Sequence, residues 1–511
     1  MQGFKARVVP SIGSGARERV PEPVRAVVVG GGLAGCAAAT VLAERGVAVT
    51  VLERNDYLGG RAGAWTERFP DGRPFEMERG FHAFFRQYYN LRNLLRRIDP
   101  GLHHLTPLLD YPLLGPHGAH ESFTGLPRRP PFNVLALIRR TPRLRLHDLL
   151  RVNGAAALEM AAYDPATTWR DLDHENARDY LDSLRFPPDA RRMLFNVFSH
   201  SFFNPEEGLS AADMLMMFHF YFMGNPEGLV FDVLDEPFSL ALWHPLRRYL
   251  AGRGVTFRLR TAAERVERRE GGWRVALAGT AEALEAELVV LATEVPALRD
   301  LVARSPQLDD PGWRRRVDRL DVTLPFAVWR AYLDRPVRHD RHPFVGTTGL
   351  GHVDNISVYE RFEGESRRWA METGGSVVEV HAYGVEERVT EAEIREDFVR
   401  QLHELYPETA AAKPLHELFL LRRDCASFAP GTYADRTPVE TPFPGLALAG
   451  DFVRLPFPTA LMERATASGF LAANVLLDRW HVRPEDLLSV PDRGLLAPLR
   501  PLFPSLRAIW P

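Results

Sequence analysis

The sequence predicts an α/β fold in which a domain built on a parallel β-sheet is interwoven with a second, mixed α+β domain. The chain has 511 residues, more than one hydrophobic core normally supports. Short, largely apolar runs at 26–29, 47–52 and 288–293 are typical of strands buried on both faces of a parallel sheet. A helical pattern separates the first two runs, which predicts the strand–helix–strand unit of such a sheet.

Composition and charge exclude several other classes of protein. Hydrophobic residues make up 45% of the chain and charged residues 25%, as in an ordinary globular protein. A net charge of −3 provides no global field for holding nucleic acid, so we expect no nucleic-acid partner. Cys36 and Cys425 have no metal-ligand or CxxC spacing, which favours a reduced, cytosolic compartment and no metal site. Residues 1–23 have no apolar core of the kind that a secretory signal needs, and we expect a loose leader.

A glycine-rich turn follows the first predicted strand directly. Gly30, Gly32 and Gly35 form the pattern GxGxxG, which allows the tight turn, the approach of a pyrophosphate, and close packing of the helix on the strand. Leu33 and Ala34 begin the helix, whose first N–H groups and partial positive charge favour phosphate groups. The turn therefore predicts a dinucleotide site of the Rossmann type.

An acidic residue ends the second predicted strand. Glu53 stands eighteen residues after Gly35, where a carboxylate can accept hydrogen bonds from the ribose hydroxyls of a dinucleotide. We assign its neighbour Arg54 to the same site. Cys36, inside the helix, is interpreted as a small packing residue rather than a redox thiol.

A second glycine-rich turn, Leu58-Gly59-Gly60-Arg61-Ala62-Gly63, comes soon after the second strand and suits a longer cofactor lying across the domain. Here the sequence resembles the superfamily of flavin amine oxidases and carotenoid desaturases, whose FAD proteins carry GGR at this point. The resemblance implies that FAD is the cofactor and that Gly59, Gly60 and Arg61 approach its pyrophosphate. The alternative interpretation of these residues is a surface turn.

The region near the C-terminus resembles the second half of the same FAD site. A predicted strand ends at Gly450 and Asp451, and a helix begins near Leu461 and Met462. The resemblance assigns Asp451 to the ribityl or pyrophosphate region of FAD. It also places the helix N-terminus at the flavin N1 and C2 carbonyl, where reduced flavin gains negative charge.

The resemblance also implies the division of the chain into domains. Segments around 255–259 and 273–277 resemble accessory strands of the FAD fold, near which the backbone of Val266 would meet the adenine. The FAD-binding domain, of the flavin amine oxidase and phytoene desaturase type, is then discontinuous. The predicted boundaries are 1–23 for the leader, 24–110, 235–300 and 415–480 for the FAD-binding domain, 111–234 and 301–414 for the mixed α+β substrate domain, and 481–511 for a C-terminal tail.

Two further motifs narrow the substrate. Residues 78–91 read ERGFHAFFRQYYNL and resemble a pattern of the plant-type carotene desaturases. Residues 462–465 read Met-Glu-Arg-Ala, where those enzymes have Met-Glu-Gly-Ala. Together they look most like the bacterial branch that aromatises the β-ionone ring, the β-carotene desaturase/methyltransferases of the isorenieratene synthase type. The resemblance implies desaturation of that ring with a 1,2-methyl migration, giving an aromatic carotenoid end group.

Aromatisation defines the chemistry that the site needs. A β-ionone ring has one double bond and a benzene ring three, so four hydrogens leave in two two-electron oxidations. FAD accepts one hydride per cycle, and a quinone or oxygen would reoxidise it. Proton loss requires a modest base, and the candidates that we assign as catalytic are His82, His219 and Asp232, with His200 and Glu236 as further possibilities. Each has a structural alternative, such as a core histidine bonded to a backbone carbonyl.

Apolar and arginine-rich segments suggest how an insoluble carotenoid reaches the site. Residues 214–223 read MLMMFHFYFM, which is either core or the wall of a tunnel for a long apolar substrate. Residues 128–151 hold seven arginines among apolar residues and form either a solvated helix or a membrane-surface segment. We expect a cytoplasmic protein with peripheral contact at the inner face of the cell membrane. Three prolines forbid a regular helix in the tail at 495–510.

Three alternative functions remain open. An acyclic carotene desaturase or isomerase would use similar residues. Amine oxidases often place a lysine near the flavin N5, and the only lysines of this chain are Lys5 and Lys413, which disfavours that activity. A non-enzymatic lipid-binding protein of the same fold, similar to the dissociation inhibitors of prenylated GTPases, would lack FAD, and Glu53, Arg61 and Asp451 argue against it.

Overall fold

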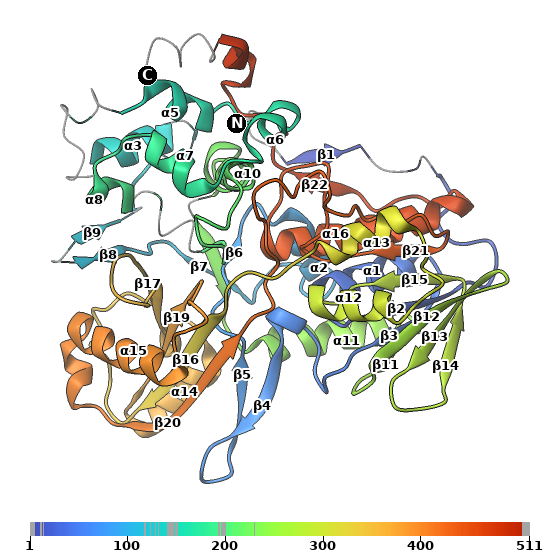
Figure 1. Cartoon of the computed structure of the whole chain (residues 1–511). Coiled ribbons are helices and arrows are strands. Elements are labelled where there is room, and N and C mark those ends of the chain that lie inside the picture. Colours follow the sequence, from blue (N-terminus) through green and yellow to red (C-terminus); the bar gives the residue numbers. More distant parts are fainter. Residues whose placement is uncertain are drawn as a thin grey trace.

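The computed structural model confirms the predicted α/β fold (Figure 1). It describes residues 6–10, 13, 15–116, 119–122, 124–127, 129–130, 132–140, 148, 152–192, 195, 201–228 and 230–502. One domain is built on a parallel sheet and a second on a larger mixed sheet, and a group of short helices lies beside both (Figure 1). No helix in these ranges is long and apolar enough to cross a lipid bilayer.

Five parallel strands from three distant segments form the first sheet. Their order is β11 (Thr256–Arg258), β3 (Ala48–Leu52), β2 (Arg25–Val29), β15 (Leu288–Leu291) and β21 (Leu446–Leu448). The segment at 255–259, predicted as an accessory strand, instead provides β11, because its backbone pairs with the edge of β3. The accessory sheet is antiparallel and consists of β12 (Ala263–Arg269), β13 (Gly272–Leu277) and β14 (Ala283–Ala286).

Two helices rich in small residues pack closely on this sheet. They are α1 (Leu33–Glu44) and α16 (Leu461–Leu477). A Cβ atom on Gly469 of α16 would lie 2.2 Å from the carbonyl oxygen of Ala34 and 2.8 Å from the Cβ of Ala37. Glycine at 469 therefore lets the two helices approach until their backbones touch.

The second sheet has seven strands and separates a cavity from an outer helix. Its order is β20 (Pro414–Arg422), β16 (Phe326–Leu333), β19 (Ser376–Ala382), β18 (Asn355–Val358), β17 (Phe344–Thr347), β8 (Leu113–Gly115) and β9 (Ala119–Glu121). Val378 and Val380 pack in one cluster with Phe398 of α15 (Glu391–Leu405), whereas Val328 and Val377 pack in another cluster on the opposite face.

Two domain boundaries differ from the predicted ones. The segment at 415–422 lies in β20, where its backbone groups pair with β16 in the substrate sheet rather than with the parallel sheet. The helices α12 (Val295–Ala303) and α13 (Pro311–Asp318) extend the FAD-binding domain beyond residue 300, because Leu301 and Val317 are buried in the same core as the parallel strands.

The two ends of the described chain meet. Strand β1 (Arg7–Val9) pairs antiparallel with β22 (Leu487–Ser489). The predicted loose leader is therefore wrong for this segment, since its backbone finds partners in the tail. The predicted absence of a regular tail helix agrees with a 3₁₀ turn, η9 (Ala497–Leu502). Residues 503–511 lie outside the described residues.

The remaining elements connect the two sheets. Strands β6 (Phe84–Phe85), β10 (Phe231–Leu234) and β7 (Leu105–Leu108) form a small antiparallel sheet, and β4 (Ala64–Arg68) pairs with β5 (Pro74–Glu78). The other α-helices are α2 (Tyr89–Arg96), α3 (Phe132–Arg140), α5 (Gly154–Met160), α6 (Pro165–Leu172), α7 (Ala177–Ser183), α8 (Pro188–Arg191), α10 (Ala211–Phe218), α11 (His244–Ala251) and α14 (Gly364–Thr373). Short 3₁₀ or π-helical turns are η1 (Gly60–Ala62), η4 (His219–Met223), η5 (Ser239–Trp243), η6 (Tyr359–Arg361), η7 (Pro407–Ala411) and η8 (Asp478–Trp480).

The contact between α1 and α16 predicts the effect of a single methyl group. Gly469→Ala should lower the free energy of unfolding by about 1–3 kcal/mol, because overpacking at a backbone contact outweighs the improved helix propensity of about 1 kcal/mol. Gly208→Ala is the matched control, since its Cβ would meet only the Pro205 carbonyl oxygen at 3.7 Å. Chemical denaturation measures both variants, and equal stabilities would contradict the close approach.

Candidate active site

A cavity of about 570 Å³ lies at the carboxyl ends of the parallel strands and extends to the inner face of the seven-stranded sheet. This edge is where ligands bind in open α/β sheets. Residues of both domains line the cavity, so its two halves come from segments far apart in the sequence. The predicted cofactor residues on its wall are Gly30, Gly32, Leu33, Ala34, Glu53, Arg54, Gly59, Gly60, Arg61, Gly450, Asp451, Leu461 and Met462.

The three glycines of the GxGxxG turn face different surroundings. Gly30 has φ +111°, and a Cβ there would lie 2.3 Å from the carbonyl oxygen of Ala292. A Cβ on Gly35 would lie 1.9 Å from the Gly30 carbonyl oxygen, so the helix could not pack on the turn. A Cβ on Gly32, at the cavity wall, would meet no atom closer than 3.8 Å and would only touch the second glycine turn at Gly59. Gly32 therefore keeps the backbone accessible to a ligand, while the other two allow the turn itself.

Two helices begin at the cavity wall. The N-cap residues are Gly32 for α1 and Ala460 for α16, and neither provides a side-chain cap. The first N–H groups of both helices thus remain available to an anionic or polar ligand. Leu461 has φ +50°, a left-handed conformation that costs about 1–3 kcal/mol for such a residue. This strain is located where α16 meets the cavity.

The carboxylate of Glu53 organises the loop around the glycine turn. One oxygen accepts a hydrogen bond from the Gly31 N–H at 2.8 Å, and the other accepts from the backbone N–H and side-chain amide of Asn55 at 2.8 and 2.9 Å. Each oxygen has further acceptor capacity, and Glu53 lines the cavity. Its neighbour Arg54 forms an ion pair with Glu294 at 2.8 Å.

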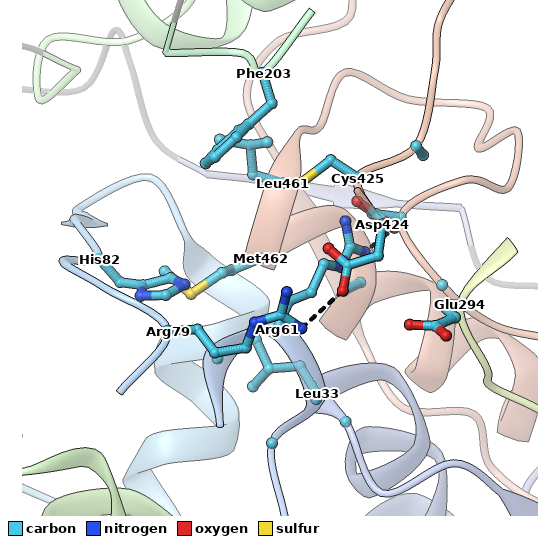
Figure 2. Close-up of a pocket in the computed structure, with 18 of the residues that line it drawn as sticks. Leu33, Arg61, Arg79, His82, Phe203, Glu294, Asp424, Cys425, Leu461 and Met462 are labelled. Atoms are coloured by element: carbon cyan, nitrogen blue, oxygen red, sulfur yellow. Dashed lines mark hydrogen bonds and ion pairs between the residues drawn. The ribbon is translucent and has the colours of Figure 1, made fainter. Parts of the chain in front are cut away.

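Two ion pairs lie together in the cavity (Figure 2). Arg61 pairs with Asp451, which joins the second glycine turn to the loop before α16, and Arg79 pairs with Asp424 at 2.7 Å. Burial acts to lower the pKa of Arg61, but the charge of Asp451 outweighs it and raises that pKa well above its usual value. The Nη2 atom of Arg79 and the Oδ1 atom of Asp424 are buried and have no hydrogen-bond partner among the residues that the structure describes. The unpaired donor of Arg79 suits a negatively charged phosphate, and the unpaired oxygen of Asp424 suits a hydroxyl group. Together with the uncrowded backbone at Gly32, they fit a dinucleotide, which carries both kinds of group.

Val266 lies away from the cavity wall. Its N–H donates to the hydroxyl of Ser305 at 2.9 Å, and its side chain is fully buried. The neighbouring residues Thr261, Ala262 and Ala263 line the cavity instead.

The three predicted catalytic residues are not together. His82 and Met462 both line the cavity (Figure 2). Its Nδ1 is 2.7 Å from the Gly80 carbonyl oxygen, and burial lowers the pKa of His82 to about 4. His219 is a core residue that stacks on Tyr163, with its Nε2 atom 2.6 Å from a backbone carbonyl oxygen. Burial also lowers the pKa of His219 to about 4.

Asp232 forms ion pairs with Arg92 and Arg86 and is absent from the cavity wall. Glu236 forms an ion pair with Arg368 outside the same cavity. His200 lies outside the described residues.

The apolar wall comes mainly from segments other than 214–223. Within that segment only Tyr221 and Phe222 reach the cavity, and the other members are buried in the core. Most of the aromatic side chains on the wall belong to short strands or loops, and they are Phe81, Phe85, Tyr88, Tyr111, Phe202, Phe203, Phe231, Phe326, Phe344 and Tyr383.

The Met-Glu-Arg-Ala segment connects α16 to its surroundings. The Glu463 carboxylate accepts the N–H groups of Asn90 at 2.8 Å and Leu91 at 2.9 Å, in the first turn of α2. Burial raises the pKa of Glu463 to about 7. The buried Arg464 guanidinium donates to the Thr459 carbonyl at 2.8 Å and lies 4.7 Å from the ring centre of Phe428. Arginine at this position thus stabilises the loop that leads into α16.

Several cavity residues were missed by sequence reasoning. Thr293 and Glu294 directly follow β15, so their position at the carboxyl end of a parallel strand was a usable signal. Asp424, His381 and Tyr383 follow or belong to strands of the second sheet, whose pairing the sequence did not reveal.

Comparisons with known proteins agree with this geometry. The family model of flavin containing amine oxidoreductases matches residues 33–477. The chain is 49% identical to a carotenoid phi-ring synthase of Streptomyces griseus, over 98% of this chain and 96% of that protein. It is 29% identical to a carotenoid phi-ring synthase of Chlorobaculum tepidum, over 94% of this chain and 92% of that protein.

Solved structures show the same fold at low sequence identity. A putrescine oxidase variant has a TM-score of 0.65 and 18% identity, covering 89% of this chain and all of that chain. Cyclohexylamine oxidase from Brevibacterium oxydans has a TM-score of 0.61 and 15% identity, covering 90% of this chain and 99% of that chain. Since the family model spans most of the sequence and the fold agrees, the chain belongs to the flavin-containing amine oxidoreductase family.

Proposed function

We propose that this FAD-dependent oxidoreductase desaturates the β-ionone ring of a carotenoid and, with a 1,2-methyl migration, produces an aromatic end group. The observation that carries the proposal is one continuous cavity with two chemical halves, a charged half at the glycine turns and an aromatic half at the second sheet. The chain's similarity to two carotenoid phi-ring synthases supports it, since a phi ring is an aromatic end group.

The bound FAD would accept a hydride in each of the two oxidations. The chain would hold its phosphates with the glycine turns and Arg61, and its ribose with Glu53. The aromatic wall would exclude water from a positively charged ring, and the faces of its rings would stabilise that charge. Quinone or oxygen is the proposed electron acceptor.

The alternative functions have less support. Lys413 is exposed at the start of β20, and the described part of the cavity wall contains no lysine, which disfavours amine-oxidase chemistry. Acyclic carotene desaturation has weaker support, from relatives such as the zeta-carotene desaturase of Synechocystis at 23% identity. The orphaned polar atoms of Arg79 and Asp424 disfavour a lipid carrier without cofactor.

Peripheral membrane contact is part of the proposal, at the inner face of the cell membrane. Phe132 at the start of α3 is 61% exposed, and Leu158 of α5 and Leu495 and Leu499 near the C-terminus are each more than 40% exposed. Arg139 and Arg140 lie in the last turn of α3. Apolar side chains near basic ones suit an anionic lipid surface. Most of the arginine-rich stretch at 141–151 lies outside the described residues.

Blocking the pyrophosphate approach tests the cofactor site. Gly32→Val should weaken FAD binding at least tenfold, equal to about 1.4 kcal/mol or more, because the new side chain enters space that the phosphates need. The backbone at Gly32 is extended and its Cβ meets no protein atom closely, so the fold should be retained. Flavin absorbance after titration with FAD measures the effect, and the melting temperatures of the two FAD-free proteins should match. Unchanged FAD affinity would place the cofactor elsewhere.

The product assay tests the substrate. The purified protein with FAD, supplied with β-carotene, should form a product four hydrogens lighter for each ring converted, with the absorption spectrum of an aromatic carotenoid. Parallel reactions contain lycopene, and each is run with a quinone and with oxygen as acceptor. Conversion of lycopene alone would exclude the ring-aromatising activity.

A further inference from the structure

Three polar side chains form a row on the cavity side of β19 and just beyond it. Glu379, His381 and Tyr383 are two residues apart, so they extend from the same face of the strand. Glu379 and His381 are buried, and Tyr383 is partly accessible at the cavity wall. Val378 and Val380, between them, face α15 on the other side of the sheet.

Hydrogen bonds connect the three side chains of this row, from Tyr383 through His381 to Glu379. The Nε2 atom of His381 is 2.7 Å from Oε1 of Glu379, and the Nδ1 atom is 2.8 Å from the Tyr383 hydroxyl. The side-chain amide of Asn355 donates to the same hydroxyl at 2.9 Å. With the imidazole neutral, Nε2 carries the hydrogen donated to the carboxylate, and the Tyr383 hydroxyl donates to Nδ1.

Glu379, the member of the row farthest from Tyr383, carries a negative charge. Glu379 accepts hydrogen bonds from the Arg330 guanidinium and from the Phe81 N–H, each at 2.8 Å. Burial acts to raise the pKa of Glu379, but Arg330 and His381 outweigh it and lower that pKa to about 2. An imidazolium formed at His381 would therefore lie beside an ionised carboxylate.

The motif at 78–82 is shaped around the same imidazole. A Cβ on Gly80 would lie 2.7 Å from Cε1 of His381, and Gly80 has φ +102°. The glycine that sequence reasoning assigned to the substrate motif thus makes room for His381. This packing fixes the ring that receives the Tyr383 hydrogen bond.

Tyr383 also lines the cavity into which the N-terminus of α16 opens. Its ring contacts Phe203 at a centroid distance of 4.6 Å, and Phe203 and Leu461 of α16 both line the cavity (Figure 2). His82, the other titratable ring on the wall, has the Gly80 backbone carbonyl as the partner of its Nδ1 atom and forms no ion pair with a carboxylate among the described residues. Protonation of His82 would therefore lack the directly bonded carboxylate that His381 has in Glu379.

We propose that Tyr383 is the catalytic residue that accepts the ring proton during aromatisation, with His381 and Glu379 as positioning residues behind it. The proposal rests on the proposed function. The C–H bond of a cationic ring breaks and its electron pair becomes a ring double bond. The proton bonds to the phenol oxygen while the hydrogen of Tyr383 moves to Nδ1 of His381, so the positive charge passes from the ring to the imidazolium. When that proton returns through the Tyr383 phenol to water, the hydrogen-bonded row regains its starting protonation state.

The test uses full-length protein loaded with FAD and compares Tyr383→Phe, His381→Gln and the double variant. Tyr406→Phe is the matched control, because its hydroxyl is buried on the α15 side of the second sheet and has no hydrogen-bond partner in the described structure. Flavin content and β-carotene binding, followed by absorbance, should equal those of the wild type. Aromatic product formation should fall by about 100-fold in Tyr383→Phe, within the range of general acid–base catalysis. The double variant should fall no further, because the two residues act as one unit.

Different outcomes separate the two proposals. If wild type and Tyr406→Phe do not convert β-carotene, the proposed function is wrong, and so is the assignment of Tyr383 as proton acceptor. If both convert it and Tyr383→Phe does so within threefold, only the assignment of Tyr383 is overturned. A loss matched by lower flavin content or weaker β-carotene binding, or multiplied in the double variant, would also overturn it. The variant His82→Gln is measured in parallel, and a loss in it while Tyr383→Phe keeps its activity would assign the proton to that imidazole instead.

Discussion

The close contact between α1 and α16 is the constraint on which the site depends. Gly469 lets the helix backbones touch at Ala34, so two N-termini from opposite ends of the sequence open onto one cavity. A larger residue at 469 would separate them and move one dipole away from the cofactor. The Arg61–Asp451 ion pair joins the loops at the same place. Cofactor binding and helix packing are therefore parts of the same arrangement.

The cavity separates charge from apolar surface. Arginine–carboxylate pairs and free helix N–H groups occupy the half that suits phosphates, whereas aromatic rings form the half beside the second sheet. A hydride acceptor can then lie between the charged half, which holds its phosphates, and the aromatic half, which excludes water. Within the dry half, the row on β19 brings a hydroxyl to the wall and keeps its counter-charge, Glu379, buried on the same face of the strand, next to His381. This arrangement accommodates a transient positive charge without admitting water.

Local patterns predicted the cofactor half of the site well. Gly30, Gly32 and Gly35 act through backbone geometry within a few residues, which a sequence motif expresses directly. The catalytic half was harder. His82 and His219 occur in similar aromatic surroundings in the sequence, yet one ring lies on the cavity wall and the other stacks on Tyr163 in the core. Apolar periodicity indicates that a residue is buried but not which atoms bury it.

The sequence by itself determined the α/β class, the strand–helix–strand unit, the glycine turns and the family resemblance, because each depends on neighbouring residues or on short motifs. Only the tertiary structure decided that 414–422 joins the second sheet, that the leader pairs with the tail, and that Glu379, His381 and Tyr383 form a hydrogen-bonded row facing the cavity. Those outcomes depend on which distant strands pair and which face they present. Such pairing is set by long-range backbone hydrogen bonds and burial, which no local pattern specifies.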